Sequence, residues 1–361
     1  MKKYLIWAAT CCITLVSMMG FSSCCGNGHQ AESALLRYHF ASQEEGQKLR
    51  LDNPAYFDAL TQNDIDWKLM SAGQSMEAYK SIAAAQIEEF SDAEKKALSK
   101  VLDFIEARMQ ELGFRLPIAD EIVFIKSRMG DEGLMGGYTF KNQVYLSADE
   151  TEFMVRTFQA DPAYDADYLE YALHFSRALV AHEIFHCLTR NNPQFRQAVY
   201  NLIGFTVMDH EVEFGPTVKE VLLHNPDEER FDSYAEFTIG GQKRRCALVG
   251  VYPGPYAQVA AQDPNAHFFD YMHLVLVPLD EPDTMIPIEE APDFYDRMGR
   301  NADYIYTAEE YLAENFCFLV AYGFFGRYDH GIVDRKIHFI PYDNPQLIRG
   351  IHSTLLEFSS R

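Results

Sequence analysis

The chain has 361 residues and a formal net charge of -22, with 48% hydrophobic, 14% aromatic and 23% charged residues. This composition is typical of a globular protein with ample apolar material for a core, and the length allows one large domain or two ordinary ones. The charge argues against a nucleic-acid partner, because no basic stripe exists to neutralise phosphates. It favours a self-repelling acidic surface, with an acidic funnel for a cationic substrate as the alternative.

The N-terminal residues have the pattern of a secretory signal. An apolar run from Tyr4 to about Phe21 follows two lysines. Two serines separate Phe21 from Cys24, which resembles a bacterial lipobox, in which the cysteine carries a lipid. The resemblance implies a lipoprotein signal peptide over residues 1–24 and a lipid-anchored protein of the bacterial cell envelope, facing the periplasm or the cell surface. The alternative is an ordinary signal peptide, or a membrane anchor in which Cys24 is incidental.

The anchor is the only membrane contact that the sequence predicts, because no other stretch approaches the ~20 apolar residues of a spanning helix. Beyond Cys24, four scattered cysteines remain without a CxxC pair: Cys25, Cys187, Cys246 and Cys317. They predict neither a disulfide framework nor a thiolate zinc site. We expect buried free thiols.

The first half of the chain predicts helices and strands in alternation. Residues 25–75 are expected to form a tether and an N-terminal segment, with the polar tether reaching to about residue 50. A helix begins after Ser91, whose capping box with Glu94 fixes its start, and ends at Gly113. Residues 121–125 predict a strand, and residues 138–147, which follow two glycines, alternate like a second strand.

The second half holds a buried helix and a long insertion. Residues 167–190 have one helical pattern that is apolar on almost every side near its C-terminal half, which predicts a buried helix. Residues 191–301 are rich in proline and predict an irregular, partly β insertion. Helices follow over residues 307–322, capped by Thr307, and 345–356. These elements together predict an α+β protein.

The chemistry is carried by an HExxH motif at His182, Glu183 and His186. Residues four apart lie on one face of a helix, so the two imidazoles can converge on one metal ion. Glu183 can then reach a water on that metal as general base. The alternative is a surface helix with a salt-bridged Glu. The apolar flanks argue against it, because burying two histidines and a carboxylate without a metal or dense hydrogen bonding is costly.

A third ligand is needed, since catalytic zinc usually has three protein ligands and one open position. A metzincin would place a glycine and a third histidine where Thr189 and Asn192 stand, so that class is excluded. Glu310 and Glu314 lie four apart in the 307–322 helix, where one can bind the metal and the other can orient a ligand histidine. The helix dipole explains Glu309 at the helix start.

The HExxH motif followed by these two glutamates resembles the gluzincin group of zinc metallopeptidases, and locally its anthrax lethal factor branch. The resemblance implies Zn²⁺ as cofactor, Glu310 as third ligand and Glu314 in a supporting role. It also implies an upstream tyrosine at the open metal position, either Tyr304 or Tyr306. Two departures are clear: the spacing from the tyrosine to Glu310 is one residue short, and the gap between His186 and Glu310 is far longer than usual.

The sequence therefore predicts a zincin-like catalytic domain over residues 76–361, with an insertion at about 191–301. The expected function is zinc-dependent hydrolysis of a peptide or protein substrate. Two alternatives stay open: a catalytically silent zincin-like binding or structural lipoprotein, and a metal-dependent amidase acting on a cell-wall or glycan-linked substrate. In zincins an edge strand placed like residues 138–147 pairs with an extended substrate.

Overall fold

The computed structural model describes residues 36–118, 120–161, 166–302, 304–330 and 337–359. The predicted signal peptide, Cys24 and Cys25 lie outside the described residues. The described part mixes helices and strands, which confirms the α+β class. None of its helices is long and apolar enough to cross a membrane. Of its cysteines, Cys187, Cys246 and Cys317 are buried free thiols, as predicted.

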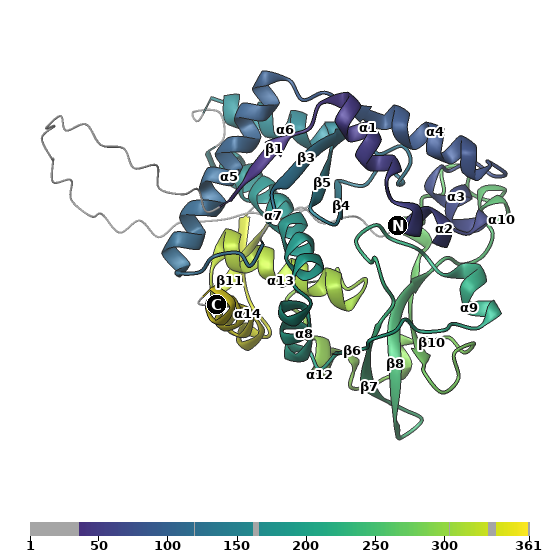
Figure 1. Cartoon of the computed structure of the whole chain (residues 1–361). Helices are drawn as coiled ribbons and strands as arrows, with labels where there is room; N and C mark the ends of the chain where they lie inside the picture. The colour runs from purple at the N-terminus through teal and green to yellow at the C-terminus, as the bar shows by residue number, and fades with distance from the viewer. Residues whose placement is uncertain (1–35, 119, 162–165, 303, 331–336, 360–361) are drawn as a thin grey trace, which may run out of the picture.

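The helices are distributed over the whole described chain (Figure 1). They are α1 (Gln43–Leu51), α2 (Pro54–Ala59), α3 (Gln62–Lys68), α4 (Met76–Gln86), α5 (Asp92–Leu112), α6 (Ala148–Gln159), α7 (Ala166–Asn191), α8 (Pro193–Leu202), α9 (Pro216–Val221), α10 (Tyr256–Ala260), α11 (Phe268–Tyr271), α12 (Phe294–Met298), α13 (Ala308–Tyr322) and α14 (Pro345–Ser359), with a 3-10 turn at Ile288–Glu290.

The first sheet is mostly parallel and ends in an antiparallel edge strand. Its order is β1-β3-β5-β4, with β2 paired to β3. The strands are β1 (Tyr38–Phe40), β2 (Ile87–Glu88), β3 (Ile122–Ser127), β4 (Gly137–Phe140) and β5 (Gln143–Ser147). Because β4 pairs with β5 alone within this sheet, it forms the edge nearest to the long helix α7.

The second sheet is antiparallel and lies in the segment predicted as an insertion. Its order is β10-β9-β8-β7-β6. The strands are β6 (Thr206–Val207), β7 (Ser233–Ile239), β8 (Gln242–Val251), β9 (His273–Pro278) and β10 (Ile286–Pro287); a separate hairpin pairs β11 (Gly326–His330) with β12 (Ile337–Pro341). The insertion is thus more regular than its proline content suggested.

Helices α7 and α13 pack against each other at the centre of the molecule, and Figure 1 shows α7 between the first sheet and α13. Their contact faces are apolar: Ile184 and Phe185 of α7 and Leu312 and Phe316 of α13 are fully buried in the main core. The packing of these two faces brings the polar side chains of both helices to one place. The buried helix predicted at residues 167–190 is therefore confirmed.

Other predicted elements are confirmed with small shifts at their ends. Helix α5 begins with the capping box of Ser91 and Glu94, and Gly113 ends it in the left-handed region at φ 75°. Thr307 caps α13 by accepting a hydrogen bond from the backbone N–H of Glu310. The last predicted helix is α14.

Two local predictions are wrong. The single strand expected at residues 138–147 is the hairpin β4–β5, in which Lys141 takes a positive φ of 52° in the turn. Lys141, Asn142 and Gln143 are three consecutive polar residues that interrupt the alternation at this turn, a signal that the prediction of a single strand passed over. The tether predicted to about residue 50 is also wrong from residue 38 on, because β1 pairs with β3 and Arg50 is fully buried.

Arg50 explains why a polar segment belongs to the fold. Its guanidinium donates to Asp131 at 2.7 Å and to Glu132 at 2.7 Å, and Lys68 contacts the other oxygen of Glu132 at 2.5 Å. These charges are paired inside the protein, although Arg50 Nη1 and Asp131 Oδ1 have no hydrogen-bond partner among the described residues. Removing one member would leave an uncompensated buried charge. The cluster ties α1 and α3 to the segment that leads into β4, and so helps to fix the edge strand.

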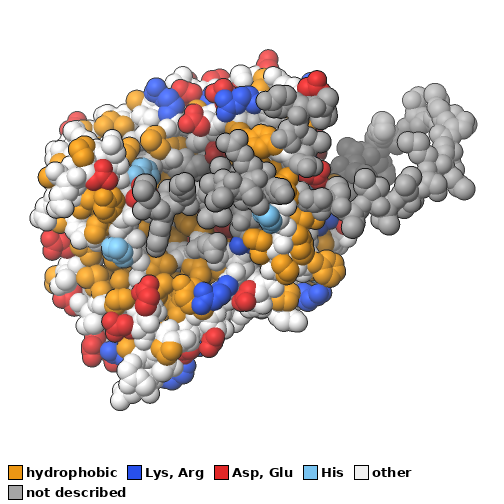
Figure 2. Space-filling model, turned by 180° about the vertical axis from the view of Figure 1, so that it is seen from behind, with side chains coloured by type: hydrophobic (Ala, Val, Ile, Leu, Met, Phe, Trp, Pro, Cys, Tyr) orange, Lys and Arg blue, Asp and Glu red, His pale blue; other side chains and the backbone are white. Residues whose placement is uncertain are grey.

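The surface agrees with the excess of acidic residues. On the face that Figure 2 shows, acidic and basic side chains are interspersed with apolar ones.

Candidate metal centre

The candidate site lies where α7 and α13 face each other. Helix α7 supplies His182, Glu183 and His186, and α13 supplies Glu310 and Glu314. Helix α13 begins after Thr307, whose hydroxyl caps its first turn. Because this cap fixes where the helix begins, it also fixes Glu310 on the side of α13 that faces α7. Potential ligand atoms of His182, His186 and Glu310 lie within 4.8 Å of one another. The predicted ligand set is thus brought together by the fold.

His186 is completely buried and is held by one of its two ring nitrogens. Its Nδ1 lies 3.1 Å from Glu309 Oε1, so the ring can donate its N–H to that carboxylate. Its Nε2 has no hydrogen-bond partner among the described residues and lies 3.6 Å from Glu310 Oε1. A buried nitrogen lone pair facing a carboxylate is an arrangement that a cation between them would satisfy.

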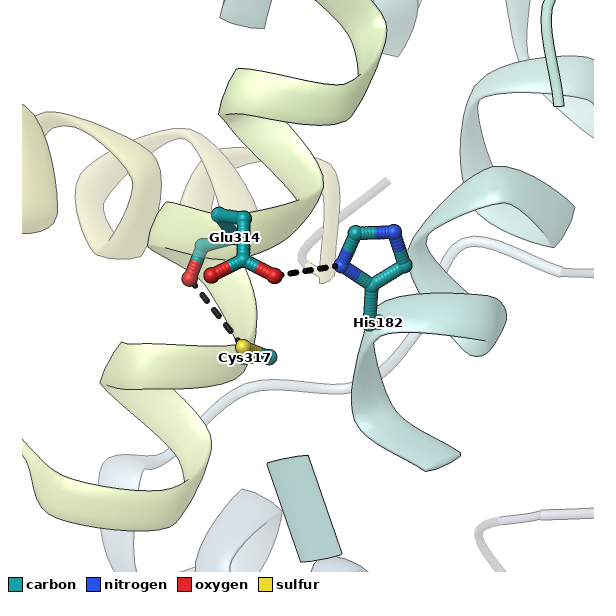
Figure 3. A group of neighbouring side chains, drawn as sticks. All are labelled: His182, Glu314 and Cys317. Carbon is teal, nitrogen blue, oxygen red and sulfur yellow. Dashed lines mark hydrogen bonds and ion pairs between the residues drawn. The ribbon is translucent and has the colours of Figure 1, made fainter. Parts of the chain in front are cut away.

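His182 is arranged in the same way. Its Nδ1 lies 3.2 Å from Glu314 Oε1, and its Nε2 lies 3.2 Å from Glu310 Oε2. Figure 3 shows the first of these contacts, together with the thiol of Cys317, which donates to the backbone carbonyl of Glu314. Each imidazole therefore has a carboxylate at Nδ1 and turns Nε2 toward Glu310, which is how ligand histidines are oriented in metal sites.

Two other groups of side chains have metal-ligand spacing. One comprises His182, Glu314 and Cys317. It would use a thiol whose pKa burial raises to about 12, and would take Nδ1 away from its orienting carboxylate. The other comprises Glu183, His186 and Asp227, which offers a single imidazole. The group of His182, His186 and Glu310 fits zinc better, because the Nε2 atoms of both imidazoles face the one carboxylate of Glu310.

The electrostatics of the site also suit a cation. Burial opposes the charged form of His182, but its contacts with Cys317, Glu310 and Glu314 outweigh this and raise its pKa well above the ordinary value. Burial and the charges of Glu183 and Glu310 raise the pKa of Asp227 well above its ordinary value. Negative charge is therefore crowded here, and a divalent cation would relieve the crowding.

Glu183 stands beside this group on the side of β4. It is 2% exposed, and its Oε2 accepts a hydrogen bond from the Thr139 hydroxyl at 2.8 Å. Burial raises the pKa of Glu183, against the opposing charges of His182 and His186 and the hydrogen bond from Thr139. A raised pKa makes this carboxylate a stronger base, as a general base requires.

Gly137 is needed where β4 passes Glu183. A Cβ added there would lie 2.8 Å from Glu183 Oε1 and 3.2 Å from the backbone oxygen of Tyr145. Gly137→Ala should therefore displace the carboxylate of Glu183 while leaving the three metal ligands in place. We expect hydrolysis to fall by about tenfold or more, since small misplacements of a catalytic group are costly, with zinc affinity unchanged. Kinetics and zinc titration measure both.

Gly136→Ala is the matched control for this change. A Cβ at Gly136 would meet its nearest neighbour, Glu150 Cγ, at 3.8 Å, which is an ordinary contact. Equal activities of the two variants would mean that the position of Glu183 does not matter for the reaction.

Glu309 has a role that the sequence analysis missed. It is 4% exposed, accepts from His186 and from the Thr189 hydroxyl, and accepts from the Tyr200 hydroxyl at 2.8 Å. Burial opposes its ionisation, but the hydrogen bond and charge of His186 outweigh burial and lower the pKa of Glu309 to about 2. The helix dipole alone does not explain Glu309, because an acid that interacts with the dipole does not need the buried hydrogen-bond partners that Glu309 has.

Glu309→Ala should weaken zinc binding by about tenfold to a hundredfold, because His186 loses the acceptor that fixes its ring. Glu309→Gln keeps one acceptor oxygen and should have a smaller effect. Competition with a fluorescent zinc chelator measures the affinities, and Glu289→Ala, at an exposed position, is the control. Wild-type affinity in Glu309→Ala would show that Glu309 does not orient a ligand.

Asn225 and Asp227 form a turn, in which the Asp227 N–H donates to Asn225 Oδ1 at 3.1 Å. Its position at the site was not predicted. Asp227 Oδ1 lies 3.9 Å from His186 Nε2, and Asn225 Nδ2 lies 3.5 Å from Glu310 Oε1. No sequence spacing connects this turn with α7 or α13, so only the fold reveals it.

The two candidate tyrosines differ in their surroundings. Tyr306 is buried, and its hydroxyl donates to the backbone carbonyl of Leu223 at 3.2 Å. Burial, followed by the charge of Glu310, raises the pKa of Tyr304 well above its ordinary value. For Tyr306, the charge of Glu228 contributes more than that of Glu310. Because the Tyr306 hydroxyl already donates to Leu223, Tyr304 is the better candidate for a role at the site.

Comparison of the chain with protein-family models, with curated proteins and with solved structures gave no match. The chemical interpretation of the site consequently depends on its residues and on their geometry.

Proposed function

We propose that this chain is a zinc-dependent metallohydrolase that cleaves peptide bonds. One observation carries the proposal: His182 and His186 each have Nδ1 next to a carboxylate of α13 and turn Nε2 toward Glu310. Two imidazoles and one carboxylate form the ligand set of catalytic zinc in several peptidases. The resemblance of the motif to gluzincins supports the same ligands and a zincin-like fold.

Zinc held by these three residues would polarise a substrate carbonyl and lower the pKa of a water molecule at the open position. Glu183 accepts the proton of the attacking water as the new C–O bond forms. It then delivers that proton to the amide nitrogen as the C–N bond breaks. Thr139 orients Glu183 through its hydroxyl, and Tyr304 is the candidate to stabilise the negative charge that develops on the carbonyl oxygen.

The lipobox-like sequence supports a location at the cell envelope, where the substrate would be a peptide or protein. An amidase acting on cell-wall or glycan-linked amides uses the same chemistry and is the second candidate. A binding or structural lipoprotein that keeps zinc for stability is the third. These functions differ in what the zinc-loaded protein cleaves.

The test is to incubate the zinc-loaded protein with a degenerate peptide library and, separately, with cell-wall fragments, and to identify products by mass spectrometry. Zinc-dependent cleavage of peptides is the expected result. Cleavage of cell-wall fragments alone would favour the amidase. Stoichiometric zinc without cleavage of either would favour the silent lipoprotein and contradict the proposed peptidase.

A further inference from the structure

The strand β4 is placed to bind an extended peptide. It is the edge of the first sheet, and its residue Thr139 contacts Glu183, so a peptide added along this edge would pass the proposed base and metal. Thr139 pairs with Val144 on β5, yet its N–H bonds elsewhere and therefore faces outward from the sheet. Main-chain pairing with an exposed edge is a common mode of peptide recognition.

This outer edge is already occupied by the chain itself. The N–H of Thr139 donates to Asp227 Oδ1 at 2.7 Å, and the N–H of Lys141 donates to Glu229 Oε1 at 2.9 Å. Both acceptors belong to the segment Asn225–Glu229, which we call the blocking segment. Two carboxylates of one short segment thus take the backbone donors that an incoming strand would use.

The blocking segment also covers the candidate metal centre. The same Oδ1 of Asp227 that accepts from Thr139 lies 3.9 Å from His186 Nε2. Asn225 contacts Glu310, the other side of the ligand set, through its amide. A substrate carbonyl at the open position would have to enter the space between β4 and these ligands, where Asp227 is found.

Arg190 at the end of α7 holds the blocking segment in place. Its Nη2 donates to the backbone carbonyl of Pro226 at 3.3 Å, and its Nε lies 3.2 Å from Glu229 Oε1. A cavity of about 210 Å³, lined in part by Arg190, Asp227 and Glu228, adjoins the segment. The segment is therefore held by polar contacts that include those of Arg190, and a cavity lies next to it.

We propose that the blocking segment occupies the place of an extended peptide substrate and must leave β4 before a peptide can bind. This inference rests on the proposed function of the site. It makes the protein latent in the conformation described. Glu229 is the release point, because it bonds both Arg190 and Lys141 in the turn that follows β4, and it is not one of the proposed metal ligands.

The test uses Glu229→Ala in the full chain, with Glu229→Gln as a milder variant that keeps one acceptor. The control is Glu213→Ala, at an exposed position of the same insertion. Hydrogen exchange of the Thr139 and Lys141 amides reports whether the edge is covered. Binding of a peptide hydroxamate, a zinc chelator with an extended backbone, reports whether it is available, and zinc titration reports the metal site.

We expect Glu229→Ala to exchange the Thr139 and Lys141 amides faster and to bind the hydroxamate about fivefold or more tightly, since at least one hydrogen bond of the blocking segment is lost. Zinc affinity should stay at the wild-type value, and Glu229→Gln should lie between. If zinc binds but exchange and hydroxamate affinity do not change, the blocking role is wrong and the proposed function stands. If wild-type protein binds no zinc, the proposed function fails, and the inference fails with it.

Discussion

Replacing Glu183 by Gln is expected to slow hydrolysis by about a hundredfold to ten-thousandfold, the range that general acid–base catalysis contributes. The amide has nearly the shape of the carboxylate and can still accept from the Thr139 hydroxyl, but it cannot take a proton from water. The proposed ligands are His182, His186 and Glu310, and Glu183 is not one of them. The variant should therefore bind zinc as the wild type does. Rates on a peptide cleaved by the wild type, with zinc content measured on the same samples, test this.

Glu289→Gln is a suitable control for this change, because Glu289 is exposed and far from the ligands in sequence. It should behave as the wild type. A Glu183→Gln variant that keeps its biological function and its zinc would favour a structural or binding role for the metal over catalysis.

Removing a metal ligand should have the second large effect. A structural zinc site in small peptides binds with about 10–16 kcal/mol, so losing one of three ligands should cost about 3–5 kcal/mol, or a hundredfold or more in affinity. We expect this loss for His186→Ala and for Glu310→Gln. The stabilisation by zinc should fall with it, since a ligand at a hundred times its Kd stabilises the native state by about 2.7 kcal/mol.

Thermal unfolding with and without zinc measures this effect. The wild type should melt several degrees higher with zinc than with a chelator, and the two ligand variants should show almost no difference. Glu314→Gln is an informative comparison, because it alters only the group next to Nδ1 of His182 and should keep most of the zinc effect. Equal stabilisation of His186→Ala and wild type would place the metal elsewhere.

The central helices could be predicted because their local and tertiary signals agree. The apolar flanks of His182 and His186 predicted a buried α7, and the four-residue spacing of Glu310 and Glu314 selected the face of α13 that meets it. The resemblance to gluzincins then indicated that Glu310, and not Glu314, is the third ligand. This choice stays a prediction, and the contacts of Glu310 with both imidazoles agree with it.

Glu309 and the blocking segment could not be predicted, for a different reason. An acid in the first turn of a helix is sufficiently explained by the dipole, and nothing in its sequence neighbourhood points to Tyr200 or Thr189 as partners. Asn225 and Asp227 have complete local explanations as turn residues. Their functional contacts arise from the connection between α9 and β7, whose path depends on tertiary packing.

The hairpin at residues 138–147 was missed although the sequence carries a sign of it. Three consecutive polar residues, Lys141, Asn142 and Gln143, interrupt the period of two where the turn lies. The positive φ of Lys141 decides for the hairpin, and lysine is not a residue that signals such a turn. The error matters for function, because the hairpin makes β4 an edge strand next to Glu183.

The most direct test of the account is a crystal structure of the zinc-loaded protein with anomalous data collected on both sides of the zinc absorption edge. We predict one strong peak, about 2.0–2.2 Å from His182 Nε2, His186 Nε2 and a carboxylate oxygen of Glu310, with Glu309 and Glu314 still next to the Nδ1 atoms. A peak among Glu183, His186 and Asp227, a peak at Cys317, or no peak at full zinc occupancy of the crystal would contradict the proposed centre.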